Sequence, residues 1–209
     1  MGAHLHALRV RTRDRREGKE RVKLKAIEKI CKAAKTVILW PTEDGRVFAG
    51  DGGAFYLLPD ALSKISARDM LDVFDVPVDK QSDWSARECE PSERGEEMFA
   101  DGGVAEDGAE PVEMTLGVCG DVLRPVGNAF EMHMIDEMYL KPLEDERSMC
   151  YFFLRHAGDT PYIAVKSGMM LHAVIMPKKI APKVCGQIVQ TITDAARTQQ
   201  GLWEGDAHD

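Results

Sequence analysis

The side chains in this sequence that are best suited to metal binding or nucleophilic catalysis are six histidines and five cysteines. They are His4, His6, His133, His156, His172 and His208, with Cys31, Cys89, Cys119, Cys150 and Cys185. None of them forms the C-x-x-C or H-E-x-x-H spacing that presents two ligands to one metal. Asp44 and Asp136–Glu137 lack a partner arrangement for acid–base catalysis. We therefore expect no metal, no cofactor and no enzymatic activity; an enzyme whose residues converge only in space is our least favoured alternative.

The glycine-rich stretch Gly50-Asp51-Gly52-Gly53 invites comparison with a phosphate-binding loop. It lacks the Gly-Lys-Ser/Thr ending of such loops, and no predicted helix follows it directly. Glycines also supply the positive φ angles that a tight reversal between two strands needs. The stretch therefore predicts the turn of a β-hairpin.

The composition is that of an acidic globular domain. The chain has 209 residues with 27 basic and 35 acidic side chains, a formal charge of −8. An acidic body argues against simple wrapping by nucleic acid, which needs dense contacts from Lys and Arg. No stretch reaches the ~18 apolar residues of a membrane span. The odd number of cysteines favours reduced thiols, so we expect a cytoplasmic protein without membrane association.

The first 21 residues differ from the rest of the chain. They carry seven basic and three acidic side chains, a net charge of +4, and show no period that would bury an apolar face. We interpret residues 1–21 as a disordered leader. Residues 16–21 can be encoded by a purine run like a ribosome-binding site, and Val22 by an alternative start codon, which suggests a true start at Val22. The competing interpretation is a basic arm that grips nucleic acid.

From Val22 onward, one order of elements occurs twice. In the first copy, a helix over Leu24–Lys35 is followed by a buried strand, Thr36–Trp40, and a hairpin that stops at Pro59. In the second copy, a short helix over Ile135–Leu143 is followed by a strand and by a hairpin that stops at Pro177. The strands of this second copy are predicted at Tyr151–Leu154, Tyr162–Lys166 and Met170–Met176.

We interpret residues 22–200 as a single domain with two halves, 22–87 and 114–180. Between the halves, residues 88–113 contain ten acidic residues and a single basic one, Arg94. Such a segment lacks the hydrophobicity to offset its own ordering. It is predicted to be a mobile acidic insertion, with shielding or partner mimicry as the alternative. A C-terminal amphipathic helix is predicted over 181–200, and a disordered tail over 201–209.

The repeated order predicts an internal duplication. Our alignment places Val37 with Tyr151 and Val47 with Tyr162. Two such units can pair edge to edge with both helices on one face, which buries more apolar surface than either unit alone. Coincidence is the alternative, because helix–strand–hairpin is a common local order.

The segment PYIAVKSGMMLHAVIMPKKI (Pro161–Ile180) resembles the C-terminal strands of bacterial sliding clamps, the processivity rings of DNA replication. There a strand pair runs into an apolar residue, a proline and a basic residue, as in Val174-Ile175-Met176-Pro177-Lys178 here. One clamp domain contains a βαβββ unit twice. The resemblance covers Val22–Pro59 and Phe130–Ile180. It implies an α+β fold of DNA-clamp type, two βαβββ half-modules with helices on one face of antiparallel sheets, here with an added C-terminal helix.

The resemblance also implies a role. In the family, helices line the ring and present Lys and Arg to the DNA backbone without reading bases. The matching residues of the first helix are Lys23, Lys25, Lys29, Lys32 and Lys35. Phosphate contacts of this kind are sequence-independent and salt-sensitive. The expected function is that of a non-enzymatic accessory protein of phage or mobile-element origin that binds double-stranded DNA or replication proteins.

Two features depart from the family. The second predicted helix is acidic, with Asp136, Glu137, Glu144 and Asp145 against Lys141. A clamp ring needs six such domains and this chain offers one, so a ring would be a homo-oligomer of six copies. The alternative function is therefore a protein–protein interaction module of clamp fold that does not bind DNA.

Overall fold

The computed structural model describes the backbone of residues 15–90, 92–118 and 120–180, and their side chains except those of 15–23, 93–94 and 145–148. The chain divides into two compact units, Met1–Pro177 and Lys178–Asp209. All described helices and strands belong to the first unit. The predicted C-terminal helix (181–200), the tail (201–209) and residues 1–14 of the predicted leader lie outside the described residues.

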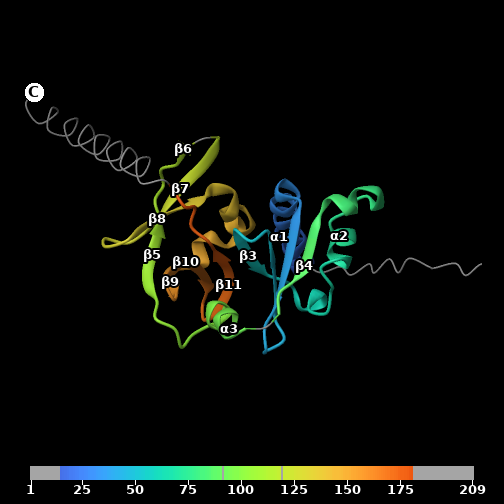
Figure 1. The fold of residues 1–209 in the computed structure, drawn as a ribbon. Coiled ribbons are helices and arrows are strands. Elements are labelled where there is room, and N and C mark those ends of the chain that lie inside the picture. Colours follow the sequence, from blue (N-terminus) through green and yellow to red (C-terminus); the bar gives the residue numbers. More distant parts are fainter. Residues whose placement is uncertain (1–14, 91, 119, 181–209) are drawn as a thin grey trace, which may run out of the picture. The chain divides into compact units, whose positions relative to one another are not determined.

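The described chain is an α+β protein built on one mixed sheet of eleven strands (Figure 1). The strands are β1 (Thr36–Pro41), β2 (Val47–Gly50), β3 (Ala54–Leu57), β4 (Ser85–Glu88), β5 (Asp107–Pro111), β6 (Leu116–Val118), β7 (Asp121–Gly127), β8 (Met132–Asp136), β9 (Cys150–Ala157), β10 (Thr160–Ser167) and β11 (Met170–Ile175). The helices are α1 (Arg15–Ala34), α2 (Asp69–Val73) and α3 (Glu93–Phe99), with 3-10 helices η1 (Asp60–Leu62), η2 (Val78–Asp83) and η3 (Glu137–Met149). The strand order is β4-β1-β2-β3-β11-β10-β9-β5-β7-β6, with β8 beside β7. The pair β4–β1 is parallel and the other described pairs are antiparallel.

Helix α1 follows from the spacing of its apolar residues. Ile27, Ile30 and Cys31 recur on one side of the helix and are buried. The helix ends at Ala34 because Lys35 adopts a left-handed conformation with φ 49°. The predicted amphipathic helix is thus confirmed, and its apolar side packs on the sheet.

Two helix boundaries differ from the prediction. Helix α1 already includes residues 15–21, so the prediction of a leader without regular structure is wrong for that part. Arg, Lys and Glu favour helix even where they bury no apolar face. The helix predicted over Ile135–Leu143 is the 3-10 helix η3, and it starts after strand β8. It contains Pro142, which lacks the N–H group that a regular α-helix needs there.

The two copies of the repeated order pair edge to edge. We call α1-β1-β2-β3 the first repeat and η3-β9-β10-β11 the second repeat. Strand β3 pairs with β11 in antiparallel register, with Tyr56 opposite Ala173. Helices α1 and η3 contact each other and share one core on the same face of the sheet. Strand β4 lies beside β1 and strand β5 beside β9, but β4 runs parallel to its neighbour and β5 antiparallel to its own.

The predicted alignment of the repeats is wrong by one residue. Val37 points into the core beneath α1, and in the second repeat Phe152 points into the same core. Tyr151, which the alignment placed with Val37, is 63% exposed. Val47 and Tyr162 likewise belong to cores on opposite faces. The side-chain period of a strand is two, so a shift of one residue exchanges the faces.

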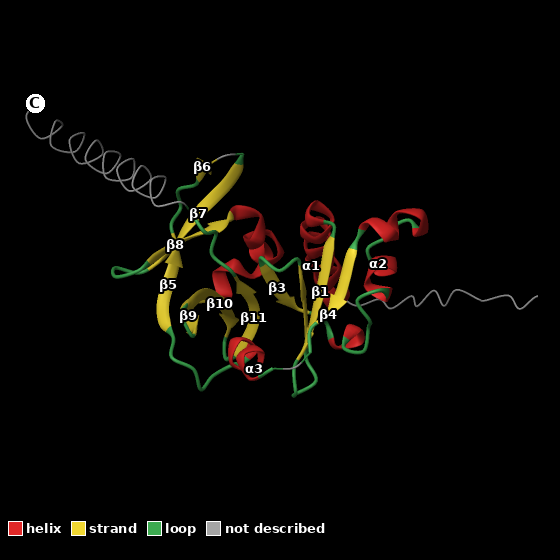
Figure 2. Cartoon of the chain, viewed as in Figure 1, coloured by secondary structure: helices red, strands yellow, loops and turns green. Residues whose placement is uncertain are grey.

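Two hydrophobic cores lie on the two faces of the sheet. Figure 2 shows the helices and strands that contribute to them. The helix-side core contains buried residues of α1, α2 and η3, including Ile30, Met70 and Leu140. The α3-side core contains Met98 and Phe99 of α3 together with residues of both hairpins. Each repeat is therefore covered on both faces.

The prediction of a mobile acidic insertion over residues 88–113 is wrong. The segment contains α3 and β5, and β5 pairs with β9 in the central sheet. The Ser92 side chain caps α3 by accepting a hydrogen bond from the Gly95 N–H. Phe99 is buried with its ring centroid 4.6 Å from that of Phe48. Two apolar residues, Met98 and Phe99, thus anchor a segment whose overall composition is acidic.

Candidate nucleic-acid interface

The lysines of α1 form a row on its exposed side. Lys25, Lys29 and Lys32 are exposed and stand at i, i+4 and i+7, opposite the buried face of the helix. Lys35 is exposed just beyond the helix end. The backbone at Lys23 is helical, and its side chain lies outside the described ones. We call Lys25, Lys29, Lys32 and Lys35 the α1 lysine row.

Part of this positive charge is balanced locally. Lys32 Nζ donates to Glu28 Oε1 at 2.6 Å, and Lys35 Nζ lies 3.6 Å from Asp83 Oδ2. Among the side chains that the structure describes, Lys25 and Lys29 have no carboxylate partner. Exposed pairs such as Lys32–Glu28 hold together weakly, about 0.3–0.5 kcal/mol. Phosphates can therefore compete for all four lysines.

Helix η3 beside α1 has a different charge. Glu137 is tied to Arg124 of β7 by two hydrogen bonds. Farther along η3, Lys141 and Glu144 are both exposed. The exposed η3 side chains that the structure describes therefore carry both signs of charge, whereas α1 exposes lysines. Of the acidic residues predicted for this helix, Asp136 belongs to β8, and the side chain of Asp145 lies outside the described ones.

No protein-family model, curated protein or solved structure matches this chain.

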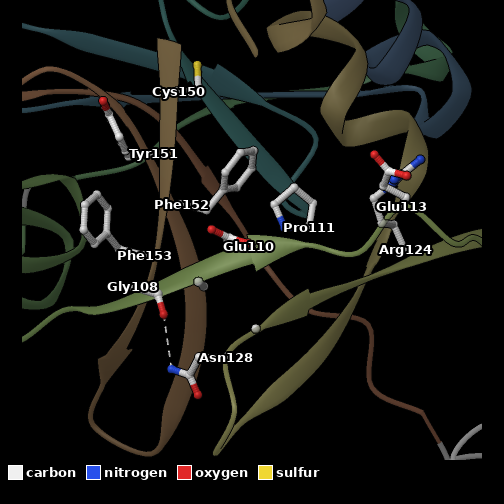
Figure 3. Close-up of a pocket in the computed structure, with 12 residues that line it drawn as sticks. Gly108, Glu110, Pro111, Glu113, Arg124, Asn128, Cys150, Tyr151, Phe152 and Phe153 are labelled. Atoms are coloured by element: carbon white, nitrogen blue, oxygen red, sulfur yellow. Dashed lines mark hydrogen bonds between the residues drawn. The ribbon is translucent and has the colours of Figure 1, made fainter. Parts of the chain in front are cut away.

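A second surface feature lies between strands β5, β7 and β9 (Figure 3). We call this opening of about 980 Å³ the fork groove. Residues that line it include Gly108, Glu110, Glu113, Asn128, Tyr151 and Phe153. The sequence prediction missed it, because Tyr151 was assigned to a buried strand. The alternation of buried Phe152 and Leu154 is the signal that would have placed Tyr151 on the opposite face.

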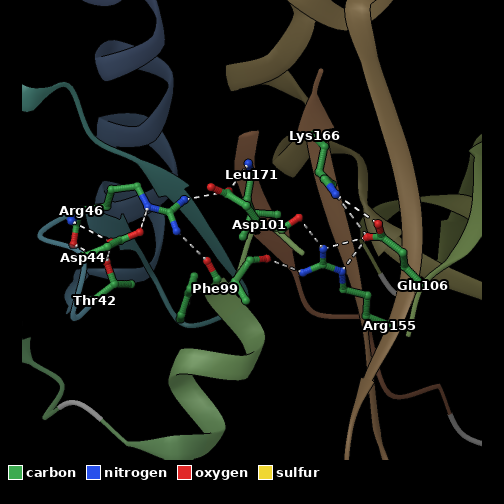
Figure 4. A network of polar contacts seen from close by, with 10 residues as sticks. Thr42, Asp44, Arg46, Phe99, Asp101, Glu106, Arg155, Lys166 and Leu171 are labelled. Carbon is green, nitrogen blue, oxygen red and sulfur yellow. Dashed lines mark hydrogen bonds and ion pairs between the residues drawn. The ribbon is translucent and has the colours of Figure 1, made fainter. Parts of the chain in front are cut away.

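Arg155, Lys166 and Glu106 form a cluster of charged groups on the α3 side of the second repeat (Figure 4). Arg155 is fully buried, and its guanidinium donates to Glu106 Oε2 at 3.0 and 2.7 Å and to the Ala100 carbonyl at 2.7 Å. Lys166 Nζ donates to Glu106 Oε1 at 3.1 Å. Burial alone would raise the pKa of Glu106, but the hydrogen bonds and charges of Arg155 and Lys166 lower it below its ordinary value. Both cations face a carboxylate and are shut off from solvent, so the cluster is structural.

Asp101 extends this network to the first repeat. Its Oδ1 accepts hydrogen bonds from Arg46 Nη1 at 2.8 Å and from the Leu171 N–H at 2.7 Å. Arg46 also donates to Asp44 Oδ2 at 2.7 Å. One acidic loop residue therefore links Arg46, which directly precedes β2 of the first repeat, to β11 of the second repeat (Figure 4).

The glycine-rich stretch is the turn between β2 and β3, as predicted. Gly52 has φ 99°, and Asp51 Oδ1 accepts hydrogen bonds from the Gly53 and Ala54 N–H groups at 2.9 and 3.1 Å. Asp51 Oδ2 accepts one from the Tyr139 hydroxyl at 3.1 Å. Asp51 therefore stabilises the turn and joins it to η3.

Among the described residues, the histidines and cysteines do not gather into a metal site. There, no group of three or more His, Cys, Asp or Glu side chains is arranged to hold a metal ion. His133 Nε2 lies 2.6 Å and His156 Nε2 3.4 Å from Glu131 Oε1. Burial, with a smaller contribution from the charge of Asp51, raises the pKa of Cys31 to about 12, so this thiol stays protonated at neutral pH. In the described part of the chain, no helix combines the length and apolarity that crossing a bilayer requires.

Proposed function

We propose that this protein is a non-enzymatic accessory factor of DNA replication, with a DNA-clamp-like architecture, that contacts double-stranded DNA through the α1 lysine row. The pairing of the two repeats through β3 and β11, with α1 and η3 on one face, supports the architecture. The observation that carries the function is the exposed row at Lys25, Lys29 and Lys32, opposite the buried side of α1.

The size of the row sets the strength of the contact. Lys25 to Lys32 spans seven residues, about 10 Å along a helix. Neutralising about three phosphates gives a slope of log affinity against log salt of about −3. A single copy would bind weakly, and several copies around one duplex would bind far more tightly through multivalency. We therefore include assembly of several copies in the proposal.

The test is a salt titration of DNA binding. Fluorescence anisotropy of a labelled duplex is measured at about 50 and 200 mM salt, with the full chain and with the double variant Lys29→Glu/Lys32→Glu. We expect sequence-independent binding that weakens with salt and is largely lost in the variant. The matched control is Lys64→Glu/Lys80→Glu, which makes the same charge change at two exposed lysines outside α1.

Two results would contradict DNA binding through α1: no binding of the unmodified protein at the lower salt concentration, or equal losses in the two double variants. Light scattering supplies the oligomeric state on the same samples. A strict monomer that also fails to bind DNA would favour the second candidate function, a protein–protein interaction module of clamp-like fold. The fork groove with its exposed Tyr151 is the observation that favours that candidate.

A further inference from the structure

The fork groove exists because strand β5 changes partners. Its pairing with β9 runs from Asp107–Leu154 to Ala109–Phe152. The next residues, Glu110 and Pro111, pair with β7 instead. Strand β9 extends beyond Phe152, so the two strands separate there and the groove opens between them (Figure 3). An opening between separated strands can receive another extended segment.

The exposed aromatic side chain of Tyr151 lines this groove. Tyr151 is 63% exposed although it belongs to an otherwise largely buried central strand. The neighbouring Phe153 already has a cation, Lys166 Nζ, 5.3 Å from its ring centroid. Tyr151 thus offers a ring that can accept a cation or an aliphatic side chain from a partner.

The charge of the groove selects the kind of partner. Glu110 and Glu113 are exposed, and Glu110 makes no ion pair with any described residue. The basic side chain among the lining residues, Arg124, is bound by Glu137 and donates to the Val112 carbonyl at 2.7 Å. These carboxylates repel DNA phosphates and attract lysine and arginine.

We propose that the fork groove binds an extended segment of another protein that carries an arginine or lysine beside apolar residues. The cation lies over the Tyr151 ring and pairs with Glu110, and the backbone of the segment follows the separated strands β5 and β9. This surface shares no residue with the α1 lysine row, so the proposal stands or falls independently of DNA binding.

The experiment uses the full chain and two labelled synthetic peptides, RVRVRVR and EVEVEVE, followed by fluorescence anisotropy. We expect the arginine peptide to bind and the glutamate peptide not to bind. Glu110→Lys and Tyr151→Ala should each weaken binding of the arginine peptide about tenfold. The matched control Asp79→Lys reverses an exposed charge outside the groove and should change affinity less than about twofold.

Urea unfolding of each variant shows whether it is folded, so lost binding is not confused with unfolding. Equal affinity for the two peptides, or an effect of Asp79→Lys as large as that of Glu110→Lys, would overturn the proposal. The proposal would also be overturned if the groove proved to be filled by the chain's own amino-terminal residues or by a second copy of the chain. If changing Arg9, Arg11 and Arg13 to Glu in the full chain strengthens peptide binding tenfold or more, the chain's own amino-terminal residues fill the groove. If Glu110→Lys dissociates an oligomer in light scattering, a second copy fills it.

Discussion

The first and second repeats present similar hairpins to α3 and the loop after it. The most prominent contacts are aromatic over the first repeat and ionic over the second. Over the first repeat, Phe99 packs on Phe48, with ring centroids 4.6 Å apart, and on Trp40 at 5.2 Å. Over the second repeat, Arg155 and Lys166 are buried against Glu106. The acidic segment thus adds apolar contacts to both hairpins through Met98 and Phe99, and it adds a carboxylate for the buried cations of the second repeat. These contacts explain how a stretch so rich in Asp and Glu is integrated into the fold.

The helical layers differ as well. Helix α1 of the first repeat exposes lysines, whereas η3 of the second repeat exposes both Lys141 and Glu144. Two repeats of the same element order can therefore expose lysines on one helix and side chains of both charges on the other. The exposed positions of a helix tolerate this change because they do not contribute to the core.

The largest effect is expected from removing the apolar anchor of the first repeat. Phe99→Ala leaves a cavity between α3 and the aromatic side chains beneath it and should lower the free energy of unfolding by about 3–5 kcal/mol. Urea unfolding measures the loss. Val78→Ala, at an 82% exposed position, is the control and should change stability by less than about 0.5 kcal/mol. A loss near the control value would mean that α3 does not stabilise the first repeat.

The ionic anchor of the second repeat comes next. Glu106→Gln removes the carboxylate that faces Arg155 and Lys166 and should cost about 2–3 kcal/mol at neutral pH, because two buried cations lose their counter-charge. Glu110→Gln, at an exposed carboxylate, is the matched control. If the two variants are equally stable, the cluster over the second repeat contributes little.

The same carboxylate predicts a pH dependence. The pKa of Glu106 is lower in the folded protein than its ordinary value of 4.5. A group of this kind contributes stability above its unfolded pKa and loses it as the pH falls through its folded pKa. The difference in unfolding free energy between the unmodified protein and Glu106→Gln should therefore be constant near neutrality and shrink below about pH 4.5. A difference that grows toward acid pH would contradict the assignment.

A smaller effect is expected where α3 approaches the first repeat. A Cβ at Gly95 would lie 2.2 Å from Cζ2 of Trp40. Helix propensity favours Gly→Ala by about 1 kcal/mol, but strain in a packed site costs about 1–3 kcal/mol. Gly95→Ala should therefore lose about 1 kcal/mol in thermal or urea unfolding. Gly102→Ala, where nothing lies within 4 Å of the added Cβ, should not be destabilised.

The smallest effect tests the link between the repeats on the helix side. Tyr139→Phe removes the hydroxyl that donates to Asp51 and should cost about 1 kcal/mol. The Tyr139 carbonyl still accepts from the Tyr56 hydroxyl at 2.7 Å, so η3 should stay in place. Hydrogen exchange at Gly53 and Ala54 would show the turn loosening; unchanged protection there would mean that Asp51 holds the turn without help from η3.

Local patterns predicted much of the fold and part of the candidate site. The spacing of Ile27, Ile30 and Cys31 predicted the buried side of α1. The same spacing placed the lysines of this helix on its exposed side. The turn at Asp51–Gly53 was predicted from glycine chemistry alone. These features depend on residues within a few positions of each other, so a single sequence contains the information.

Other features required contacts across the chain. The sequence determined by itself where apolar faces, strands and tight turns form, because side-chain spacing and backbone freedom are local properties. Only the tertiary structure decided that residues 92–111 contribute a helix and a strand, that Tyr151 faces outward, and that a groove opens beside β5. Glu106 meets Arg155 and Lys166 from 49 and 60 positions away. Ordering such a segment costs conformational entropy, which its composition indicates. The contacts that offset this cost come from residues far away in the sequence, and composition does not reveal them.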